Sequence, residues 1–386
     1  AGNCAFGHSA LYSNTTGARN TAVGYYALRL NTADDNVSIG NYALEQNTTG
    51  NKAVAVGSYA LDNNTTGSDN IGIGYHALGV NTTGGNNTAV GYKALEDNNG
   101  NDNTAVGKNA LTANTTGVNN VAVGKDAAQA ITTGAGNVAI GAKALYSQTT
   151  SSNTVAIGYQ AGEDITTTNN TTLVGSGAGK NLTTGNGHTI IGTDAGGALT
   201  TSEGNVLIGQ LAGNYNVSVT GGSNVIIGLN ARGSSAGNNY ELVFGRDADG
   251  KGSNTGFMKA SSGMYQSNNS SSWSTTSDER IKKNIVDYNE GLSKILNVRV
   301  RNFEYRTEEE ITAFENPRSA KIDKQGVQLG VIAQELEQVI PTAISETSDG
   351  VKVVNDDDIM WHLVNAVKEL SAENNELKAR LDAAGL

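Results

Sequence analysis

The stretch NTAVGYYAL at residues 20–28 decides the fold, because it returns with small changes throughout the first 250 residues. Aligning the copies on the glycine after the small apolar run gives fifteen units, spaced 16 or 17 residues apart except for one spacing of 19. The aligned glycines are Gly7, Gly24, Gly40, Gly57, Gly74, Gly91, Gly107, Gly124, Gly141, Gly158, Gly175, Gly192, Gly209, Gly228 and Gly245. A fixed short period of this kind predicts a solenoid in which each unit is one coil.

The residues before each glycine predict a short β-strand. Val, Ile, Thr, Leu, Phe or Cys stands one and three residues before the glycine, and Ala, Ser or Gly stands between them in the first ten units. Because successive strand side chains point to opposite faces, we expect the β-branched residues to form the inner face of the coil. Cys4 occupies such a position, which predicts a buried, inert thiol.

Other positions predict turns and close stacking. Asn stands four residues before the glycine in ten units, and NTTG closes many units, so we interpret both as turn residues. Ala stands three residues after the glycine in all fifteen units, which indicates a crowded position against the next coil or a neighbouring chain. Coils stacked about 4.8 Å apart predict a rod of roughly 70 Å.

Composition excludes several classes of function. The single cysteine excludes an intrachain disulfide and a cysteine-based zinc cluster. The net charge of -11 argues against nucleic acid or an anionic membrane as a partner, and no apolar run is long enough for membrane insertion. The repeats lack clustered carboxylates suited to glycoside hydrolysis. We predict no cofactor and no metal.

The unit N-[TS]-[AV]-[VI]-G-x-x-A resembles the left-handed parallel β-roll of trimeric autotransporter adhesin heads, the YadA-like family, a fold also used in phage tail fibres. The resemblance covers residues 1–248, although the unit is slightly longer than that family's usual one. It implies a left-handed parallel β-roll solenoid and a homotrimer whose rolls pack around an axis. The chain is therefore predicted to be mainly β.

Two recurring side chains suggest binding roles beside structural ones. A stack of tyrosines after the glycine could form a sugar platform, but packing between coils is the preferred interpretation. These tyrosines are Tyr25, Tyr42, Tyr59, Tyr75, Tyr92 and Tyr159. Thr pairs such as Thr48 with Thr49 invite an ice-binding interpretation, yet adjacent strand residues face opposite ways and turn chemistry explains the pairs.

The chain changes character after Gly245. Residues 249–276 are polar and Ser-rich, which predicts a linker or stalk. Residues 277–386 are predicted to form a small α+β domain that ends in a coiled-coil helix at 356–384. Asn355 suits the cap of that helix, since a side-chain cap and the following acidic residues complement its dipole.

The final helix carries a heptad seam that requires partner helices. Asn374 occupies an a position in this seam, where it fixes register at a cost in stability. The predicted trimer seam is Leu363, Val367, Leu370, Asn374, Leu377 and Leu381.

TTSDERIKKNI at residues 275–285 opens the C-terminal domain. Together with GVIAQELE at 330–337 and VNAVKEL at 364–370, it resembles the intramolecular chaperone of phage tail spikes and fibres, the S74 peptidase family. The resemblance implies that the domain drives trimerisation of a β-rich fibre and then releases itself by cutting the bond between Thr276 and Ser277.

The resemblance also implies roles for single residues. Ser277 is then the nucleophile and Lys282 its general base, while Asp278, Arg280 and Asn284 match the motif in a supporting role. Serine needs such a base, and lysine serves only when burial or a nearby cation lowers its pKa.

The spacing of five between nucleophile and base restricts the geometry. It separates the two side chains by about 140° on a helix and sends them to opposite faces of a strand, so the dyad needs a turn or a lysine from another chain. In the competing interpretation, Thr276 and Glu279 form a capping box at a solvated helix start. The two further motifs favour the chaperone.

The combined prediction is a trimeric receptor-binding or shaft segment of a phage or phage-like tail fibre. Its expected partners are copies of itself, a host cell-surface glycan or protein, and other tail or baseplate proteins. It would assemble in the host cytoplasm and act in the virion, outside the cell. The alternative is a bacterial trimeric adhesin head that keeps an uncleaved trimerisation domain.

Overall fold

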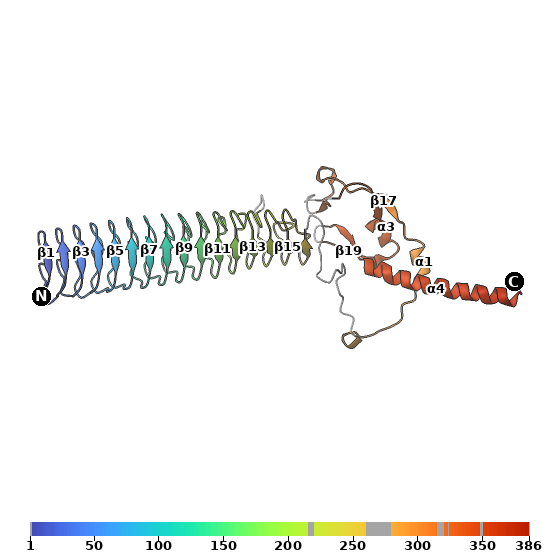
Figure 1. The fold of residues 1–386 in the computed structure, drawn as a ribbon, viewed down its shortest axis with the longest axis horizontal. Helices are drawn as coiled ribbons and strands as arrows, with labels where there is room; N and C mark the ends of the chain where they lie inside the picture. The colour runs from blue at the N-terminus through green and yellow to red at the C-terminus, as the bar shows by residue number, and fades with distance from the viewer. Residues whose placement is uncertain are drawn as a thin grey trace. The chain divides into compact units, whose positions relative to one another are not determined.

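Figure 1 shows a computed structural model of the chain. It describes residues 2–214, 220–259, 279–314, 320–322, 324–347 and 350–385. The chain divides into two compact units, Ala1–Gly250 with Asn254–Lys259 and Lys251–Ser253 with Ala260–Leu386. The first unit is a parallel β-solenoid, so the predicted mainly β solenoid fold is confirmed.

Three-residue strands form one ladder of sixteen, each paired in parallel with the strand of the next coil (Figure 1). The strands are β1 (Cys4–Phe6), β2 (Thr21–Val23), β3 (Val37–Ile39), β4 (Val54–Val56), β5 (Ile71–Ile73), β6 (Thr88–Val90), β7 (Thr104–Val106), β8 (Val121–Val123), β9 (Val138–Ile140), β10 (Val155–Ile157), β11 (Thr172–Val174), β12 (Thr189–Ile191), β13 (Val206–Ile208), β14 (Val225–Ile227), β15 (Leu242–Phe244) and β16 (Gly256–Met258). Equivalent positions pair throughout, as Val37 does with Val54, so the sequence repeat sets the strand register.

The ladder continues one strand beyond the repeated sequence. β16 lies inside the segment 249–276, which we predicted as a linker. It pairs in parallel with β15, and Phe257 packs against the solenoid core. Because strand pairing uses backbone groups, this last strand needs no copy of the repeat.

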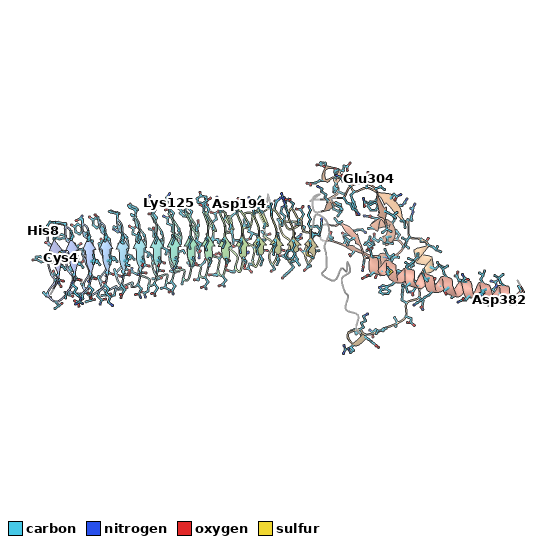
Figure 2. The ribbon with its side chains drawn as sticks, in the orientation of Figure 1. Cys4, His8, Lys125, Asp194, Glu304 and Asp382 are labelled. Atoms are coloured by element: carbon cyan, nitrogen blue, oxygen red, sulfur yellow. The ribbon has the colours of Figure 1, made fainter. Side chains whose placement is uncertain are left out.

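The inner face of the strands is the reverse of the predicted one. The small central residue points into the coil, and Ala22 and Ala55 are fully buried, whereas the β-branched Ile39 is 42% exposed. Leu44, four residues after its glycine, is fully buried and fills the coil interior, which leaves room only for a small strand residue. The predictions of an inner β-branched face and of a buried Cys4 are therefore wrong; Cys4 is exposed on the first strand (Figure 2).

Two positions fill the core of each coil: the centre of the strand and the position four residues after the glycine. The division of side-chain volume between them changes along the solenoid. Early coils combine a small strand centre with a leucine four residues after the glycine, as in Ala55 with Leu61. Later coils combine a large strand centre with glycine, as in Leu173 with Gly179. A Cβ added to Gly162 would lie 2.7 Å from Leu173 Cδ1. The alanine three residues after each glycine is buried from the second unit onward, as the predicted crowding requires.

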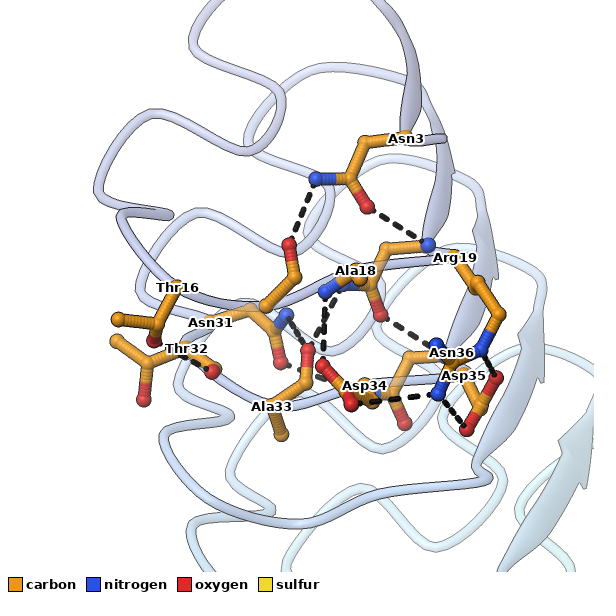
Figure 3. Close-up of polar contacts among 12 residues, drawn as sticks. Asn3, Thr16, Ala18, Arg19, Asn31, Thr32, Ala33, Asp34, Asp35 and Asn36 are labelled. Carbon is orange, nitrogen blue, oxygen red and sulfur yellow. Dashed lines mark hydrogen bonds and ion pairs between the residues drawn. The ribbon is translucent and has the colours of Figure 1, made fainter. Parts of the chain in front are cut away.

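The asparagines four residues before the glycine form a buried ladder. Asn36 Oδ1 accepts the backbone N–H of Ala53 at 2.9 Å, and its Nδ2 donates to the Gly50 carbonyl at 3.0 Å. Figure 3 shows this ladder around Asn3 and Asn36. Positive φ occurs one residue earlier, as at Asp35 with φ 62°. The interpretation of these asparagines as turn residues is therefore wrong; their amides are tolerated inside because they are hydrogen-bonded between coils.

The described part of the C-terminal unit is α+β, as predicted. Its elements are η1 (Glu279–Ile281), α1 (Leu292–Ile295), β17 (Arg301–Phe303), η2 (Glu308–Glu310), β18 (Gln328–Gly330), α3 (Ala333–Glu337), η3 (Pro341–Ala343), β19 (Ile344–Glu346), β20 (Lys352–Val354) and α4 (Asp356–Ala383). β17 pairs with β18 and β19 with β20, both antiparallel. Leu336, Ile340 and Ala343 form its small buried core.

Helix α4 begins where the sequence predicts. The side chain of Asn355 accepts the N–H of Asp357 at 3.2 Å, which confirms the cap. No helix among the described residues is both long and apolar enough to cross a membrane.

Candidate assembly and processing site

The predicted dyad lies at the edge of the described residues. Thr276, Ser277 and Asp278 fall outside them, so the separation of nucleophile and base stays open. The described motif begins with the single 3-10 turn η1, in which the Lys282 N–H donates to the Glu279 carbonyl at 3.0 Å. After Lys282 the chain turns rather than continuing as a helix.

Asn284 marks that turn. Its φ is 58°, in the left-handed region that asparagine tolerates better than most residues. The only sequence signal for this conformation is the residue type, asparagine. Residues 282–290 contain no helix or strand. The roles of Lys282, Arg280 and Asn284 in cleavage stay predictions.

The predicted seam forms an exposed apolar stripe on α4. Leu363, Val367 and Leu377 are 44%, 59% and 58% exposed in the single chain. Leu370 and Leu381 continue the stripe, with Asn374 exposed among them. An apolar face of this length is a candidate interaction surface, because single folded chains rarely leave one uncovered.

The other face of α4 contacts its own chain. His362 and Ala366 are buried on that face, and the segment Tyr288–Leu292 lies against it. Sequence reasoning missed these residues, since a heptad seam draws attention to apolar positions only. The available signal was the spacing of polar side chains at 362, 365 and 369, which also places them on one side of a helix.

Ion pairs attach both antiparallel strand pairs of the C-terminal unit to α3. Arg301 of β17 donates to the two carboxylate oxygens of Glu335 at 3.1 and 2.7 Å, and the hydrogen bonds from this guanidinium lower the pKa of Glu335. Lys352 of β20 donates to Glu337 Oε1 at 2.6 Å. These ion pairs lie at partly exposed positions, so they orient the strand pairs and add little stability.

The tyrosines of the solenoid form a packing ladder. The rings of Tyr42 and Tyr59 stack at 5.3 Å with an interplanar angle of 4°, and those of Tyr75 and Tyr92 stack at 5.4 Å with an angle of 14°. The Lys108 ammonium lies 5.7 Å from the centre of the Tyr92 ring. Stacked rings cover each other's faces, which a sugar would need, so the geometry favours the packing interpretation.

The first threonine of several Thr pairs forms a hydrogen bond to the next coil. Thr48 Oγ1 donates to the Thr65 carbonyl of the next coil at 2.9 Å, and Thr65 Oγ1 donates to the Thr82 carbonyl at 2.9 Å. The first hydroxyl of these pairs is therefore engaged between coils. Within the described ranges, no group of three or more His, Cys, Asp or Glu side chains is placed to hold a metal ion.

Comparison with known families finds a match for part of the C-terminal unit. Residues 277–345 match the model of the Peptidase S74 family, described as chaperone of endosialidase. The match begins at Ser277, the predicted nucleophile, and includes Lys282. It ends within β19, before α4. The predicted resemblance to this family is confirmed for residues 277–345.

These findings define a class of protein. A parallel β-solenoid joined in one chain to an S74 chaperone domain fits a tail-fibre-like protein. An S74 domain in that setting points to a trimerisation chaperone of a fibre-like solenoid. The phage origin, the YadA-like relationship and the handedness of the roll stay predictions.

Proposed function

We propose that this chain is a homotrimeric segment of a phage or phage-like tail fibre that takes part in host attachment. Its S74 domain aligns three chains during assembly and then releases itself by cutting between Thr276 and Ser277. The observation that carries this proposal is the family match that begins at Ser277, in a chain whose other unit is a stack of near-equivalent coils.

Exposed apolar surface supports a trimer. The α4 seam lacks cover in the single chain, and the outer β-branched residues of the solenoid form a second apolar column, with Ile73 and Ile157 38% and 37% exposed. Burying apolar surface contributes about 25 cal/mol per Å², so two long columns supply a substantial driving force. Copies of the same chain carry identical columns at identical spacing, which makes them the natural occupants.

Because the coils are nearly equivalent, the three chains need a domain that sets their alignment. Each strand pairs with its neighbour at equivalent positions, so sliding one chain by a whole coil against another replaces most contacts with similar ones. The three chains must therefore begin to associate at the same coil. Helices α4 joined at one end would set that alignment and hold the chain ends at high effective concentration.

Self-cleavage requires a neutral lysine. In the proposed step Ser277 Oγ attacks the carbonyl carbon of Thr276, Lys282 accepts the hydroxyl proton, and the Ser277 amine leaves with a proton from that lysine. Water then hydrolyses the resulting ester, which frees the Thr276 carboxylate and a new N-terminus at Ser277.

Attachment would follow release of the chaperone. The partner is a host cell-surface glycan or protein, and other tail or baseplate proteins would hold the fibre. Tyr42 packs on Tyr59 and Tyr75 on Tyr92, which favours a packing role over a sugar platform for these rings.

Intact-mass measurement and denaturing electrophoresis of wild type and Ser277→Ala test the proposal. Wild type should give two fragments that meet at Thr276 and Ser277, and Ser277→Ala should stay whole while remaining trimeric. If the wild-type chain stays whole, the self-cleavage proposal is wrong, and the alternative of an adhesin with a retained trimerisation domain is favoured. A monomeric wild type in light scattering would remove the trimer.

A further inference from the structure

One face of α4 binds the backbone of residues 288–292, just downstream of the sequence motif at residues 277–285 that holds Ser277 and Lys282. His362 Nδ1 donates to the Glu290 carbonyl at 2.9 Å, and Asn365 Nδ2 donates to the Tyr288 carbonyl at 2.6 Å. Glu369 Oε2 accepts the Leu292 N–H at 2.9 Å. Three side chains along nearly two helical turns thus satisfy three backbone groups within five residues.

Close packing accompanies these hydrogen bonds. A Cβ on Gly291 would lie 2.2 Å from the Ala366 backbone nitrogen, so only glycine fits there. Ala366 and His362 are 2% and 5% exposed. The rings of Tyr288 and His362 meet edge to face at 5.3 Å. The contact is therefore specific for one path of the chain.

The position of this contact in the sequence links it to the motif. Lys282 precedes Tyr288 by six residues, which span at most about 20 Å even when fully extended. Ser277 precedes Tyr288 by eleven residues, which span at most about 40 Å. The predicted seam, with Leu363 and Leu370, lies on the same helix as the bound segment. Any rearrangement of α4 on assembly therefore moves the anchor point of the motif.

We propose that His362, Asn365 and Glu369 form a positioning clamp that ties the Ser277 and Lys282 motif to the assembling helix. The inference rests on the proposed self-cleavage and adds the element that couples it to trimer formation. When three α4 helices align, the clamp carries each motif segment to a fixed place around their axis. Cutting is then confined to correctly assembled chains.

The test uses the full chain in four forms. These are wild type, the double variant Asn365→Ala with Glu369→Ala, the conservative variant Glu369→Gln, and the control Glu373→Ala on the next turn of the same helix. Three quantities are measured: oligomer mass by light scattering, the rate of cleavage by intact mass, and amide hydrogen exchange over residues 279–295.

The double variant should remain trimeric and cut at least tenfold more slowly, because small displacements of reacting groups cost large factors in rate. Its amides should also exchange faster across 279–295. Glu369→Gln keeps an oxygen that accepts the Leu292 N–H, so it should cut nearly as fast as wild type. Glu373→Ala should match wild type in all three measurements.

Other outcomes overturn the clamp. A double variant that cuts at the wild-type rate shows that the contact does not position the motif. If the double variant loses trimer in the same proportion as it loses cutting, and Glu369→Gln shows the same losses, the contact is purely structural. If wild type itself stays whole, self-cleavage fails, and hydrogen exchange then decides the clamp: faster exchange confined to 288–295, with 279–287 unchanged, would overturn it.

Discussion

His188 Nε2 donates to the carbonyl oxygen of Ser202 at 2.8 Å, so an imidazole takes the place that Asn205 has in the next coil. Its Nδ1 accepts the Asn205 N–H at 3.2 Å. The two ring nitrogens thus reproduce the donor and the acceptor of the amide in the ladder. Only the neutral ring can do so, because the charged ring has no acceptor.

This substitution makes one coil sensitive to acid. Burial lowers the pKa of His188 below its ordinary value of 6.5, so the unfolded chain binds a proton more readily than the folded one. Stability is therefore fully present above about pH 6.5 and is lost as the pH falls through and below that value. We expect the melting temperature of wild type to drop between pH 7.5 and 5.5 by several degrees more than that of His188→Asn.

Thermal unfolding followed by circular dichroism checks this expectation. His8→Asn is the control, since His8 is an exposed histidine in the first coil. Its curve should follow wild type. Melting temperatures of His188→Asn and wild type that fall in parallel with pH would show that the ladder histidine contributes nothing to acid sensitivity.

The division of side-chain volume between the two core positions predicts unequal effects of two small substitutions. Gly162→Ala should lower the melting temperature, because the new Cβ would meet Ile165 and Leu173 at 2.7 Å. Overpacking of this kind costs about 1–3 kcal/mol. Ala128→Gly, at the equivalent position two units earlier, should change stability by less than about 1 kcal/mol, because relief of a left-handed φ of 50° offsets a lost methyl group. Equal effects of the two variants on the melting temperature would contradict this account.

The repeat predicts the solenoid but not which strand face is buried. Period two divides the residues of a strand into two sets without saying which set points inward. The answer depends on Leu44 and its equivalents, which lie outside the strands and occupy the coil interior. The asparagine ladder was missed for a similar reason: the partners of Asn36 are Gly50 and Ala53 in the next coil, and composition alone assigns asparagine to turns.

The candidate site was predictable only in part. Ser277 and Lys282 follow from three ordered motifs, and the seam on α4 follows from its heptad spacing. The clamp does not, because His362 and Asn365 bind groups 72 and 77 residues away in the chain. Local patterns carry no information about such distant backbone partners.

The seam predicts a change in assembly without a change in the fold of the single chain. Leu370 is 50% exposed, so Leu370→Glu costs that chain little, whereas three copies would bring three buried charges together at the axis. We expect Leu370→Glu to be largely monomeric in sedimentation velocity at concentrations where wild type is trimeric. Lys368→Glu is the matched control, because it also adds an acidic residue to the exposed surface of α4 but lies outside the seam, and it should remain trimeric. A trimeric Leu370→Glu would show that this heptad position does not face the other chains.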